Sequence, residues 1–347
     1  MSTQNLMMQA LLRKNTGRPP VWFMRQAGRY HSHYQNLKKT NSFIDLCKKP
    51  EVACEATMGP IRDFGFDSAI LFSDLLFPLE AMGMGLRYEE GPKLDWHLKD
   101  KTDLNRLLSG RELVKQLSFQ SEALQMIRRA LPPEKTLLGF VGGPLTLFFY
   151  AVEGSHQGSL GSALQGLTDG RYEGFCTKLL PLLAENLKLQ ARSGADCVVI
   201  IDTCGGELSP EQYKKHVIPV LKVLLDDYRA SSKVPLFYYS KGTGPEHWET
   251  LRDLPIAGIG VDWCTPISEV LERFGDQWAI QGNFDPNEML KPRAELEPLI
   301  RDFFKPILRL PRDRLKGWIC GLGHGVLPKT PEENVRLFLR IQKELFT

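Results

Sequence analysis

The sequence predicts an α/β fold, a (β/α)8 TIM barrel formed by a single domain with extra helices in long loops after the strands. Three observations carry this prediction. Eight short apolar runs rich in β-branched and aromatic residues recur along the 347 residues, each run ends in polar residues, and helical patterns separate the runs. Runs that are almost continuously apolar are typical of strands buried on both faces of a parallel sheet. Eight such units in a chain of this length favour a barrel over a doubly wound sheet.

The predicted strands follow one another at intervals that accommodate helices. In chain order they are Val21–Gln26, Ser68–Asp74, Thr136–Gly143, Cys197–Cys204, Pro235–Gly242, Gly258–Trp263, Trp278–Asp285 and Gly317–His324. The two longest connections, residues 75–135 and 144–196, leave room for additional helices. Residues 1–19 are expected to form an N-terminal extension or helix. Because no linker rich in Pro, Gly or Ser divides the chain, residues 1–347 are predicted to form one domain.

Helix start signals lie between the predicted strands. The segments 209–212 (Ser-Pro-Glu-Gln) and 330–333 (Thr-Pro-Glu-Glu) are predicted capping boxes with proline at the first helical position, and 285–288 (Asp-Pro-Asn-Glu) is a close variant. Apolar residues at helical spacing predict helices over Leu179–Ala191 and Glu332–Phe346. Strand, short loop and capped helix form the unit that parallel crossovers require.

The charge balance argues against a polyanionic macromolecule as partner. There are 44 Lys and Arg residues against 41 Asp and Glu, a net charge of +3, and no basic tract, so no nucleic acid is expected to bind. The longest uncharged stretch, residues 136–152, is broken by glycines and a proline, and it is shorter than the ~20 apolar residues that span a membrane. We therefore expect a small or acidic ligand and no membrane partner.

The cysteines and the N-terminal residues indicate in which cellular compartment the protein is expected. The seven cysteines are an odd number, are scattered and form no C-x-x-C motif. They are expected to be reduced thiols, and a zinc site would need unusual spacing. Residues 1–10 lack a cationic segment followed by an apolar core, so no secretory signal is predicted. We expect a cytoplasmic protein.

Candidate site residues follow the carboxyl ends of the strands, where barrels of this kind build their sites. Arg25, Gln26 and Arg29 follow the first predicted strand. The polar or glycine residues after the other strands are Ser73, Asp74, Gly142, Gly143, Tyr150, Asp202, Thr203, Tyr239, Ser240, Lys241, Asp262, Asn283, Asp285 and His324. These residues are expected to meet at one mouth of the barrel.

Arg25, Arg29 and Asp74 each have two interpretations. If the turn after the first strand is helical, Arg25 and Arg29, four residues apart, project the same way and can bind several carboxylates. The alternative is a surface pair bridged to acidic neighbours. Asp74 either accepts hydrogen bonds from N–H groups of a ligand, or forms an internal pair with an arginine or caps a loop.

The other candidates carry less specific signals. Residues 142–146 (Gly-Gly-Pro-Leu-Thr) lack the P-loop lysine and the G-x-G-x-x-G spacing, so they predict a tight turn rather than a phosphate cradle. Tyr150 is either a core aromatic residue or a site residue. His324 lies between glycines and is expected to be more exposed than a histidine on an apolar face. The other histidines are expected to be solvated, among them His31, His33 and His97.

Several sequence blocks together resemble the uroporphyrinogen decarboxylase family of haem biosynthesis. They occur in the family's order at residues 21–30 (VWFMRQAGRY), 70–74 (ILFSD), 142–146 (GGPLT), 150–154 (YAVEG), 281–286 (QGNFDP) and 323–325 (GHG). The first block is highly specific, whereas the last alone is weak. The resemblance runs from about residue 20 to the C-terminus.

This resemblance implies a (β/α)8 barrel, usually a homodimer, that works without metal or organic cofactor. The family removes CO2 from the four acetate side chains of uroporphyrinogen III to give coproporphyrinogen III. By resemblance, Arg25 and Arg29 bind substrate carboxylates, one of them being a proposed proton donor, and Asp74 accepts the pyrrole N–H bonds. The implied catalytic residues are Asp74, Arg25, Arg29 and Tyr150. The implied substrate-binding residues are Arg25, Gln26, Ala27, Gly28, Arg29, Asp74, Tyr150, Thr203 and His324.

The chain departs from the family pattern at two places, and two other function classes stay open. His31-Ser32-His33 stands where the family commonly has Pro-Glu, and Cys204 stands where it often has Trp. A zinc-dependent methyltransferase of the same superfamily would need His or Cys ligands that residues 238–242 (YYSKG) do not offer. A tetrapyrrole carrier without activity is the other class. The presence together of Arg25, Arg29, Asp74 and Tyr150 argues against it.

Overall fold

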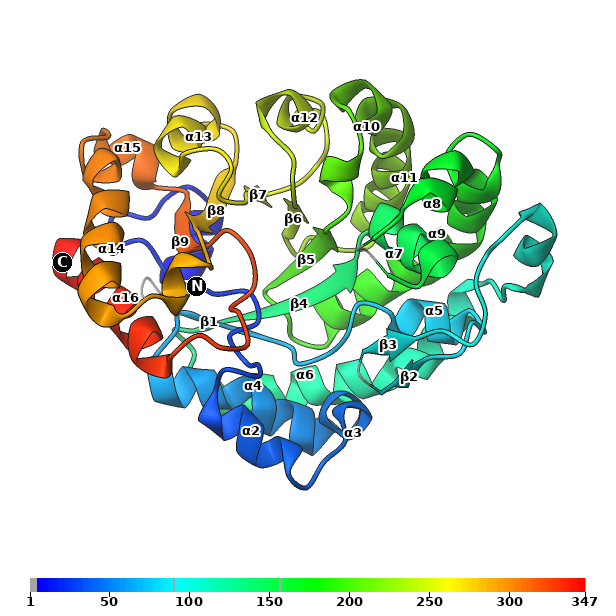
Figure 1. Cartoon of the computed structure of the whole chain (residues 1–347), viewed down its shortest axis with the longest axis horizontal. Helices are drawn as coiled ribbons and strands as arrows, with labels where there is room; N and C mark the ends of the chain where they lie inside the picture. Colours follow the sequence, from blue (N-terminus) through cyan, green and yellow to red (C-terminus); the bar gives the residue numbers. More distant parts are fainter. Residues whose placement is uncertain (1–4, 90, 156–157, 347) are drawn as a thin grey trace.

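The main sheet is parallel and curls into a barrel. The structure is a computed structural model that describes residues 5–89, 91–155 and 158–346. In the described chain, seven strands are paired in sequence order around the sheet (Figure 1). They are β1 (Ser68–Ile70), β4 (Thr136–Gly142), β5 (Cys197–Asp202), β6 (Leu236–Ser240), β7 (Gly258–Gly260), β8 (Ala279–Phe284) and β9 (Trp318–Leu322). Each lies inside one of the last seven predicted runs, so the predicted barrel-type α/β fold is confirmed.

The first predicted strand, Val21–Gln26, is wrong in its extent. Only a single parallel bridge forms there, between Val21 and Cys320. The segment still fills the gap between β9 and β1, because Trp22 N donates to Cys320 O at 3.1 Å and Asp67 N donates to Val21 O at 3.0 Å. The Asp67 carboxylate accepts from Val21 N at 2.7 Å, so a side chain supplies one of the bonds that a strand would make. Pro20 has no N–H with which to extend the pairing.

Alternate strand residues fill the barrel interior. One buried apolar cluster combines inward-facing residues of the strands with Trp22 and with α1 (Leu6–Leu11). Its described core members are Met7, Ala10, Leu11, Trp22, Met24, Leu138, Phe140, Cys197, Val199, Ile201, Phe237, Tyr239, Ala279 and Ile319. The helix expected within residues 1–19 is therefore present as α1, and it packs into the barrel interior.

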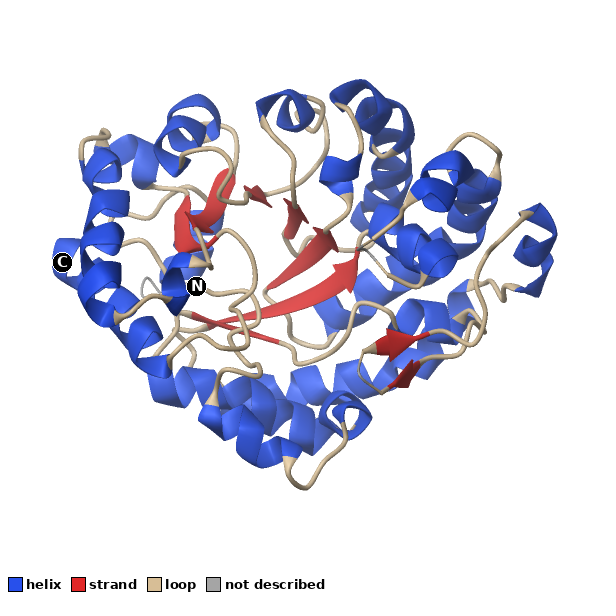
Figure 2. Cartoon of the chain, in the orientation of Figure 1, coloured by secondary structure: helices blue, strands red, loops and turns tan. Residues whose placement is uncertain are grey.

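Helices surround the sheet on its outer side (Figure 2). The remaining α-helices are α2 (Ser32–Lys38), α3 (Phe43–Lys48), α4 (Pro50–Phe64), α5 (Phe77–Ala81), α6 (Ser118–Ala130), α7 (Pro144–Glu153), α8 (Gly161–Gly166), α9 (Arg171–Arg192), α10 (Pro210–His216), α11 (Ile218–Arg229), α12 (Pro245–Glu249), α13 (Ile267–Phe274), α14 (Arg293–Leu308), α15 (Arg312–Leu315) and α16 (Glu332–Phe346). The predicted helices over Leu179–Ala191 and Glu332–Phe346 are confirmed as part of α9 and as α16. No helix in the described ranges is long and apolar enough to cross a membrane.

The two long connections contain the extra elements that their length predicts. Residues 75–135 hold α5, α6, the two-stranded hairpin of β2 (Arg87–Tyr88) and β3 (Pro92–Lys93), and the 3-10 helices η1 (Lys101–Arg106) and η2 (Arg111–Leu117). Residues 144–196 hold α7, α8 and α9. Two further 3-10 helices are η3 (Gly205–Glu207) and η4 (Glu288–Leu290).

One of the three predicted helix caps forms as expected. Ser209 Oγ accepts from Gln212 N at 3.3 Å, and Ser209 N donates to Gln212 Oε1 at 3.1 Å. The capping box at 330–333 is wrong, because Thr330 Oγ1 is buried without a hydrogen-bond partner in the described structure. At 285–288 the expected α-helix is replaced by a turn that leads into η4, since Asp285 Oδ1 accepts from Asn287 N only two residues on, at 2.8 Å.

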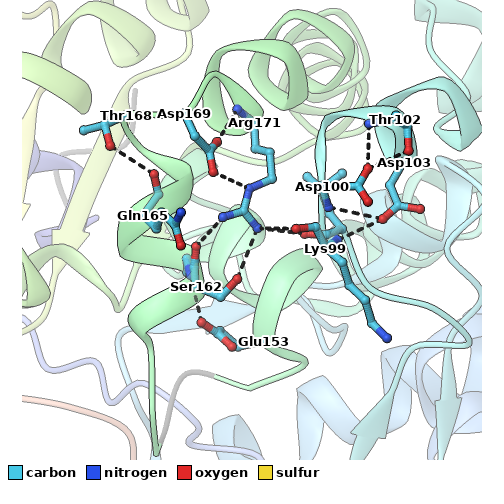
Figure 3. A network of polar contacts seen from close by, with 12 residues as sticks. Lys99, Asp100, Thr102, Asp103, Glu153, Ser162, Gln165, Thr168, Asp169 and Arg171 are labelled. Carbon is cyan, nitrogen blue, oxygen red and sulfur yellow. Dashed lines mark hydrogen bonds and ion pairs between the residues drawn. The ribbon is translucent and has the colours of Figure 1, made fainter.

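A buried arginine holds the connection that contains α7 and α8 (Figure 3). Arg171 is 2% exposed and donates to the carbonyl oxygens of residues 98–99 at 3.2 and 3.0 Å and to Ser162 O at 2.7 Å. Its Nε pairs with Asp169 Oδ2 at 2.9 Å. The backbone at residue 98 in turn donates to Ala151 O in α7 at 2.8 Å. These bonds connect α8, α9 and α7, the helix that contains Tyr150.

Candidate active site

The turn that contains Arg25 is not helical, contrary to one premise of the sequence analysis. Arg25 has a left-handed backbone with φ of 60°. Its side chain is exposed and runs along Gly325, where a Cβ would lie 2.5 Å from Arg25 Cδ. The Arg29 side chain is also exposed. Within the part of the chain that the structure describes, no carboxylate lies within 4.0 Å of either guanidinium group, so the alternative interpretation, a surface pair bridged to acidic neighbours, does not hold.

Residues 26–28 lie between the two arginines and anchor the turn. The Gln26 side chain is 1% exposed, and its Nε2 donates to Ser68 O at 2.9 Å. Tyr30 Oη donates to Gln26 O at 2.8 Å. Ala27 and Gly28 are half-buried. The Gln26 side chain therefore bonds to β1 and fixes the base of the turn that presents Arg25 and Arg29.

Asp74 is a carboxyl group on which the charge of Arg25 acts. It is half-buried, and its Oδ1 accepts from Leu76 N at 2.9 Å, so the loop cap, one of the alternatives for Asp74, is present. Burial raises the pKa of the Asp74 carboxyl, whereas the Leu76 N–H, the Tyr88 hydroxyl and the Arg25 charge lower it. The positive charge of Arg25 therefore stabilises the ionised form of Asp74.

Tyr150 from α7 belongs to the same cluster. It is half-buried, and burial raises the pKa of its hydroxyl. The negative charge of Asp74 raises the pKa of Tyr150 further, while the charge of Arg25 lowers it. The charges of Asp74 and Arg25 thus both act on the Tyr150 hydroxyl, although the three groups come from separate segments of the chain.

His324 is fixed by a tyrosine from β6. Tyr239 Oη lies 2.8 Å from Gly323 O and 2.9 Å from His324 Nδ1, and the two rings are stacked with centroids 5.8 Å apart. A carbonyl oxygen only accepts, so the tyrosine hydroxyl donates its proton to Gly323 O and accepts from His324 Nδ1–H. Nε2 is then the acceptor nitrogen of the neutral imidazole. His324 is half-buried, in agreement with the prediction that it is not a core histidine.

Thr203 follows a carboxyl group that is structural. Asp202 is fully buried, and its Oδ1 accepts from Thr146 N at 2.8 Å and Thr146 Oγ1 at 2.6 Å. Gly143 provides the space for this group, because a Cβ there would lie 2.4 Å from Asp202 Cγ. The glycine turn thus admits a buried carboxyl group, and the half-buried Thr203 is the next residue along the chain.

Sequence reasoning was wrong about His31 and missed Tyr88. His31 is fully buried, not solvated, and its Nε2 lies 2.8 Å from Asp63 Oδ2, whereas His33 and His97 are half-buried. Tyr88, which influences Asp74, lies in the hairpin β2–β3 rather than after a barrel strand. Proximity to the Ile70–Asp74 block in sequence was the one signal that could have pointed to it.

The described residues offer little for metal ligation. Within the described ranges, no three His, Cys, Asp or Glu side chains are grouped so that they could hold a metal ion. All seven cysteines are free thiols, and Cys264 is the exposed one among them. Cys204, which stands at the position where Trp is frequent, is buried, and burial raises the pKa of its thiol to about 12.

The fold is a parallel barrel, and the segments that follow its strands contribute Arg25, Asp74, Tyr150 and His324. These features define an α/β-barrel enzyme whose site combines a cationic side chain with a carboxyl group. The chain belongs to the uroporphyrinogen decarboxylase family, whose model matches residues 2–345. The uroporphyrinogen decarboxylase of Myxococcus xanthus strain DK1622 is 35% identical over 336 residues, which cover 96% of this chain and 94% of that protein. That of Sorangium cellulosum strain So ce56 is 36% identical over 333 residues, which cover 95% and 93%.

A solved structure supports the fold independently. A methyltransferase from Methanosarcina mazei superposes with a TM-score of 0.77 over 99% of both chains, at 17% sequence identity. At this identity the likeness concerns the barrel alone. The family predicted from the sequence blocks is therefore confirmed by the family match and the relatives, and the architecture by the superposition.

Proposed function

We propose that this chain removes CO2 from the four acetate side chains of uroporphyrinogen III and releases coproporphyrinogen III, as a carboxy-lyase. Membership of the family over residues 2–345 is the observation that supports this most. The cluster of Arg25, Asp74 and Tyr150 adds chemical support, because it offers a cation for carboxylates and an acceptor for N–H groups at one place.

The reaction can proceed on the substrate's own electrons. Protonation of a pyrrole ring carbon beside the acetate creates a cationic ring that accepts the electron pair of the breaking carbon–carbon bond. CO2 leaves, and a second proton then adds to the exocyclic carbon while the first is lost from the ring. The net result is exchange of CO2 for one proton. The site must therefore hold the ring, deliver protons and stabilise positive charge on the pyrrole.

Each site residue has a role in this proposal. Asp74 accepts the pyrrole N–H bonds, and its negative charge stabilises the cationic ring. The exposed guanidinium groups of Arg25 and Arg29 bind substrate carboxylates at the rim. Tyr150, Thr203 and His324 contact polar groups of the substrate. Residues 26–28 complete the substrate-binding turn.

The wider assignment follows the same family. We propose that residues 1–347 form one domain, that the protein is a cytoplasmic homodimer, and that catalysis requires no metal or organic cofactor. Neither nucleic acid nor membrane is proposed as a partner. A net charge of +3 fits a ligand with eight carboxylates that is met by a few positioned arginines rather than by a basic surface.

The deciding experiment is decarboxylation of uroporphyrinogen III by purified, metal-stripped protein under strictly reducing conditions. We expect CO2 release and stepwise formation of coproporphyrinogen III. Absence of product from correctly folded protein would refute the activity. Recovery of product only after a metal ion is added would refute the cofactor-free mechanism, and sedimentation of the same sample tests the dimer.

A further inference from the structure

The hairpin β2–β3 brings a tyrosine to Asp74 from outside the barrel strands. The Tyr88 ring packs on Phe43 with centroids 4.6 Å apart, and Phe43 packs on Phe72 with centroids 6.0 Å apart. Phe72 precedes Asp74 by two residues. Because these aromatic contacts fix the plane and position of the Tyr88 ring, they also fix where its hydroxyl lies relative to the Asp74 turn.

The Tyr88 hydroxyl has an unused hydrogen-bonding capacity. Its oxygen is buried and makes no hydrogen bond of normal geometry within the described structure. A buried hydroxyl without a partner is unfavourable and rare. The group that it faces is the Asp74 carboxyl, since the charge of Asp74 raises the pKa of Tyr88 and the Tyr88 hydroxyl lowers the pKa of Asp74. The Asp74 carboxyl is therefore a candidate acceptor for this hydroxyl.

Asp74 has room for such a donor. Its Oδ1 accepts from Leu76 N at 2.9 Å, and an ionised carboxylate accepts through about four lone-pair sites on its two oxygens. A bond from Tyr88 still leaves acceptor capacity for N–H donors of a ligand. The tyrosine is a neutral donor, so it favours the carboxylate without adding a cation that would repel a protonated pyrrole.

Other titratable groups also surround this pair. The charge of Asp74 acts on Cys47 from α3 and on Tyr150 from α7, and burial raises the pKa of both groups, so they stay neutral. Arg25 faces Asp74 as a cation. Glu80, whose charge adds to the effect of burial in raising the pKa of Tyr88, is held by Lys48 at 2.8 Å.

We propose that Tyr88 is a positioning residue for Asp74: its hydroxyl donates to the carboxylate and holds it ionised and oriented for the N–H groups of the substrate. The inference rests on the role proposed above for Asp74 as the pyrrole acceptor. Burial raises the pKa of Asp74, which favours the neutral acid, and a neutral acid is a weaker acceptor. The Tyr88 bond opposes that effect.

The first test measures the pair without turnover. The carboxyl carbons of protein labelled with ¹³C at aspartate are titrated by NMR in the wild type and in Tyr88→Phe, and Asp74→Asn identifies the Asp74 signal. We expect the Asp74 midpoint to rise by about one pH unit in Tyr88→Phe, because a charge-assisted hydrogen bond to the carboxylate is lost. An unchanged midpoint would overturn the proposal.

A matched variant distinguishes the loss of the Tyr88–Asp74 bond from the general effect of removing a buried tyrosine hydroxyl. The Tyr172 hydroxyl is likewise buried without a hydrogen-bond partner in the described structure, but it faces Cys176 and Asp202 rather than Asp74. Tyr172→Phe is expected to leave the Asp74 midpoint where it is. An equal shift in both variants would show a general packing effect and would also overturn the proposal.

The second test uses uroporphyrinogen III. In Tyr88→Phe, the acidic limb of the profile of kcat/KM against pH should shift to higher pH by the same amount as the NMR midpoint. At pH values below that limb kcat/KM should fall about tenfold, while the plateau at alkaline pH stays unchanged. A uniform loss at every pH would contradict a positioning role. If the wild type releases no CO2, the proposed function fails, while the NMR titration still decides whether Tyr88 controls Asp74.

Discussion

Arg25 lies directly against Gly325, so a glycine in the loop after β9 defines the path of the Arg25 side chain. A Cβ on residue 325 would lie 2.5 Å from Arg25 Cδ and 3.1 Å from its Nε. Val326 N also donates to Met24 O at 2.9 Å, which joins the two loops by their backbones. The direction of the Arg25 side chain therefore depends on residues about three hundred positions away in sequence.

Gly325→Ala should displace Arg25 without unfolding the protein. A methyl group cannot share the space of Cδ, so the exposed guanidinium group must move away from its present position. We expect KM for uroporphyrinogen III to rise about tenfold, because one charge-assisted bond to a carboxylate weakens. Steady-state kinetics give the value. Gly161→Ala is the control, since its Cβ would meet nothing closer than 3.9 Å, and equal kinetics in both variants would contradict the prediction.

Asp74→Asn should lose most turnover and keep the fold. The amide has the shape of the carboxyl group but carries no negative charge and presents N–H donors to the pyrrole N–H groups. We expect kcat/KM to fall at least ~100-fold, the effect of removing one preorganised electrostatic group from an active site. Asp302→Asn, at an exposed position in α14, serves as control. Near-wild-type kcat/KM for Asp74→Asn would remove Asp74 from the mechanism.

Seven of the eight strands could be predicted because a strand buried on both faces leaves a continuous apolar run in the sequence. The remaining run, Val21–Gln26, begins with four apolar residues, yet only Val21 bridges a neighbour. Two local features limit it: Pro20 cannot donate a hydrogen bond, and the left-handed backbone of Arg25 redirects the chain. The Arg25 side chain also runs along Gly325, and no local sequence pattern reveals that contact.

Site residues after barrel strands were predictable, whereas those in the connections were not. Tyr88 was not predicted because the hairpin β2–β3 lies inside the connection of residues 75–135. The alternation of predicted strands and helices says nothing about the structure within that connection. His31 was misread because the residues that follow it, Ser32 and His33, are polar, while aromatic rings pack on it in the fold. Its ring lies 4.9 Å from that of Phe64 and 5.8 Å from that of Tyr30.

The buried His31 should make stability fall on acidification. Burial lowers the pKa of His31, although the bond to Asp63 opposes this. Below the ordinary histidine pKa of about 6.5, the unfolded chain therefore binds a proton that the folded protein binds less readily. The free energy of unfolding consequently decreases as the pH falls through that range.

His31→Gln tests this dependence, because glutamine can still bond to Asp63 but does not titrate. Urea unfolding at pH 7.5 and pH 5.5 gives the loss of stability on acidification for each protein. We expect a smaller loss in the variant than in the wild type. The same loss in both proteins would show that the acid sensitivity comes from other groups.

Arg171 should be a strong determinant of stability and only indirectly of activity. The buried guanidinium group donates to three carbonyl oxygens, Ser162 Oγ and the Asp169 carboxylate (Figure 3). Arg171→Met leaves the Asp169 carboxylate and these carbonyls without their donor. Removing one partner of a buried, bonded charge costs about 3–5 kcal/mol, so urea unfolding should show a loss of this order.

Two further variants show whether stability depends on the shape of the Arg171 guanidinium group or on its charge alone. Arg171→Lys keeps the charge but cannot reproduce the planar fork that reaches residues 98–99, Ser162 and Asp169 at once, so it should recover less than half of the loss. Arg129→Met, at an exposed position without an ion pair in the described structure, should change stability by less than about 0.5 kcal/mol. Because the same bonds link α8 and α9 to α7, the Arg171 variants should also lower kcat through Tyr150. A stability loss with unchanged kcat would show that α7 is held in place by its own packing.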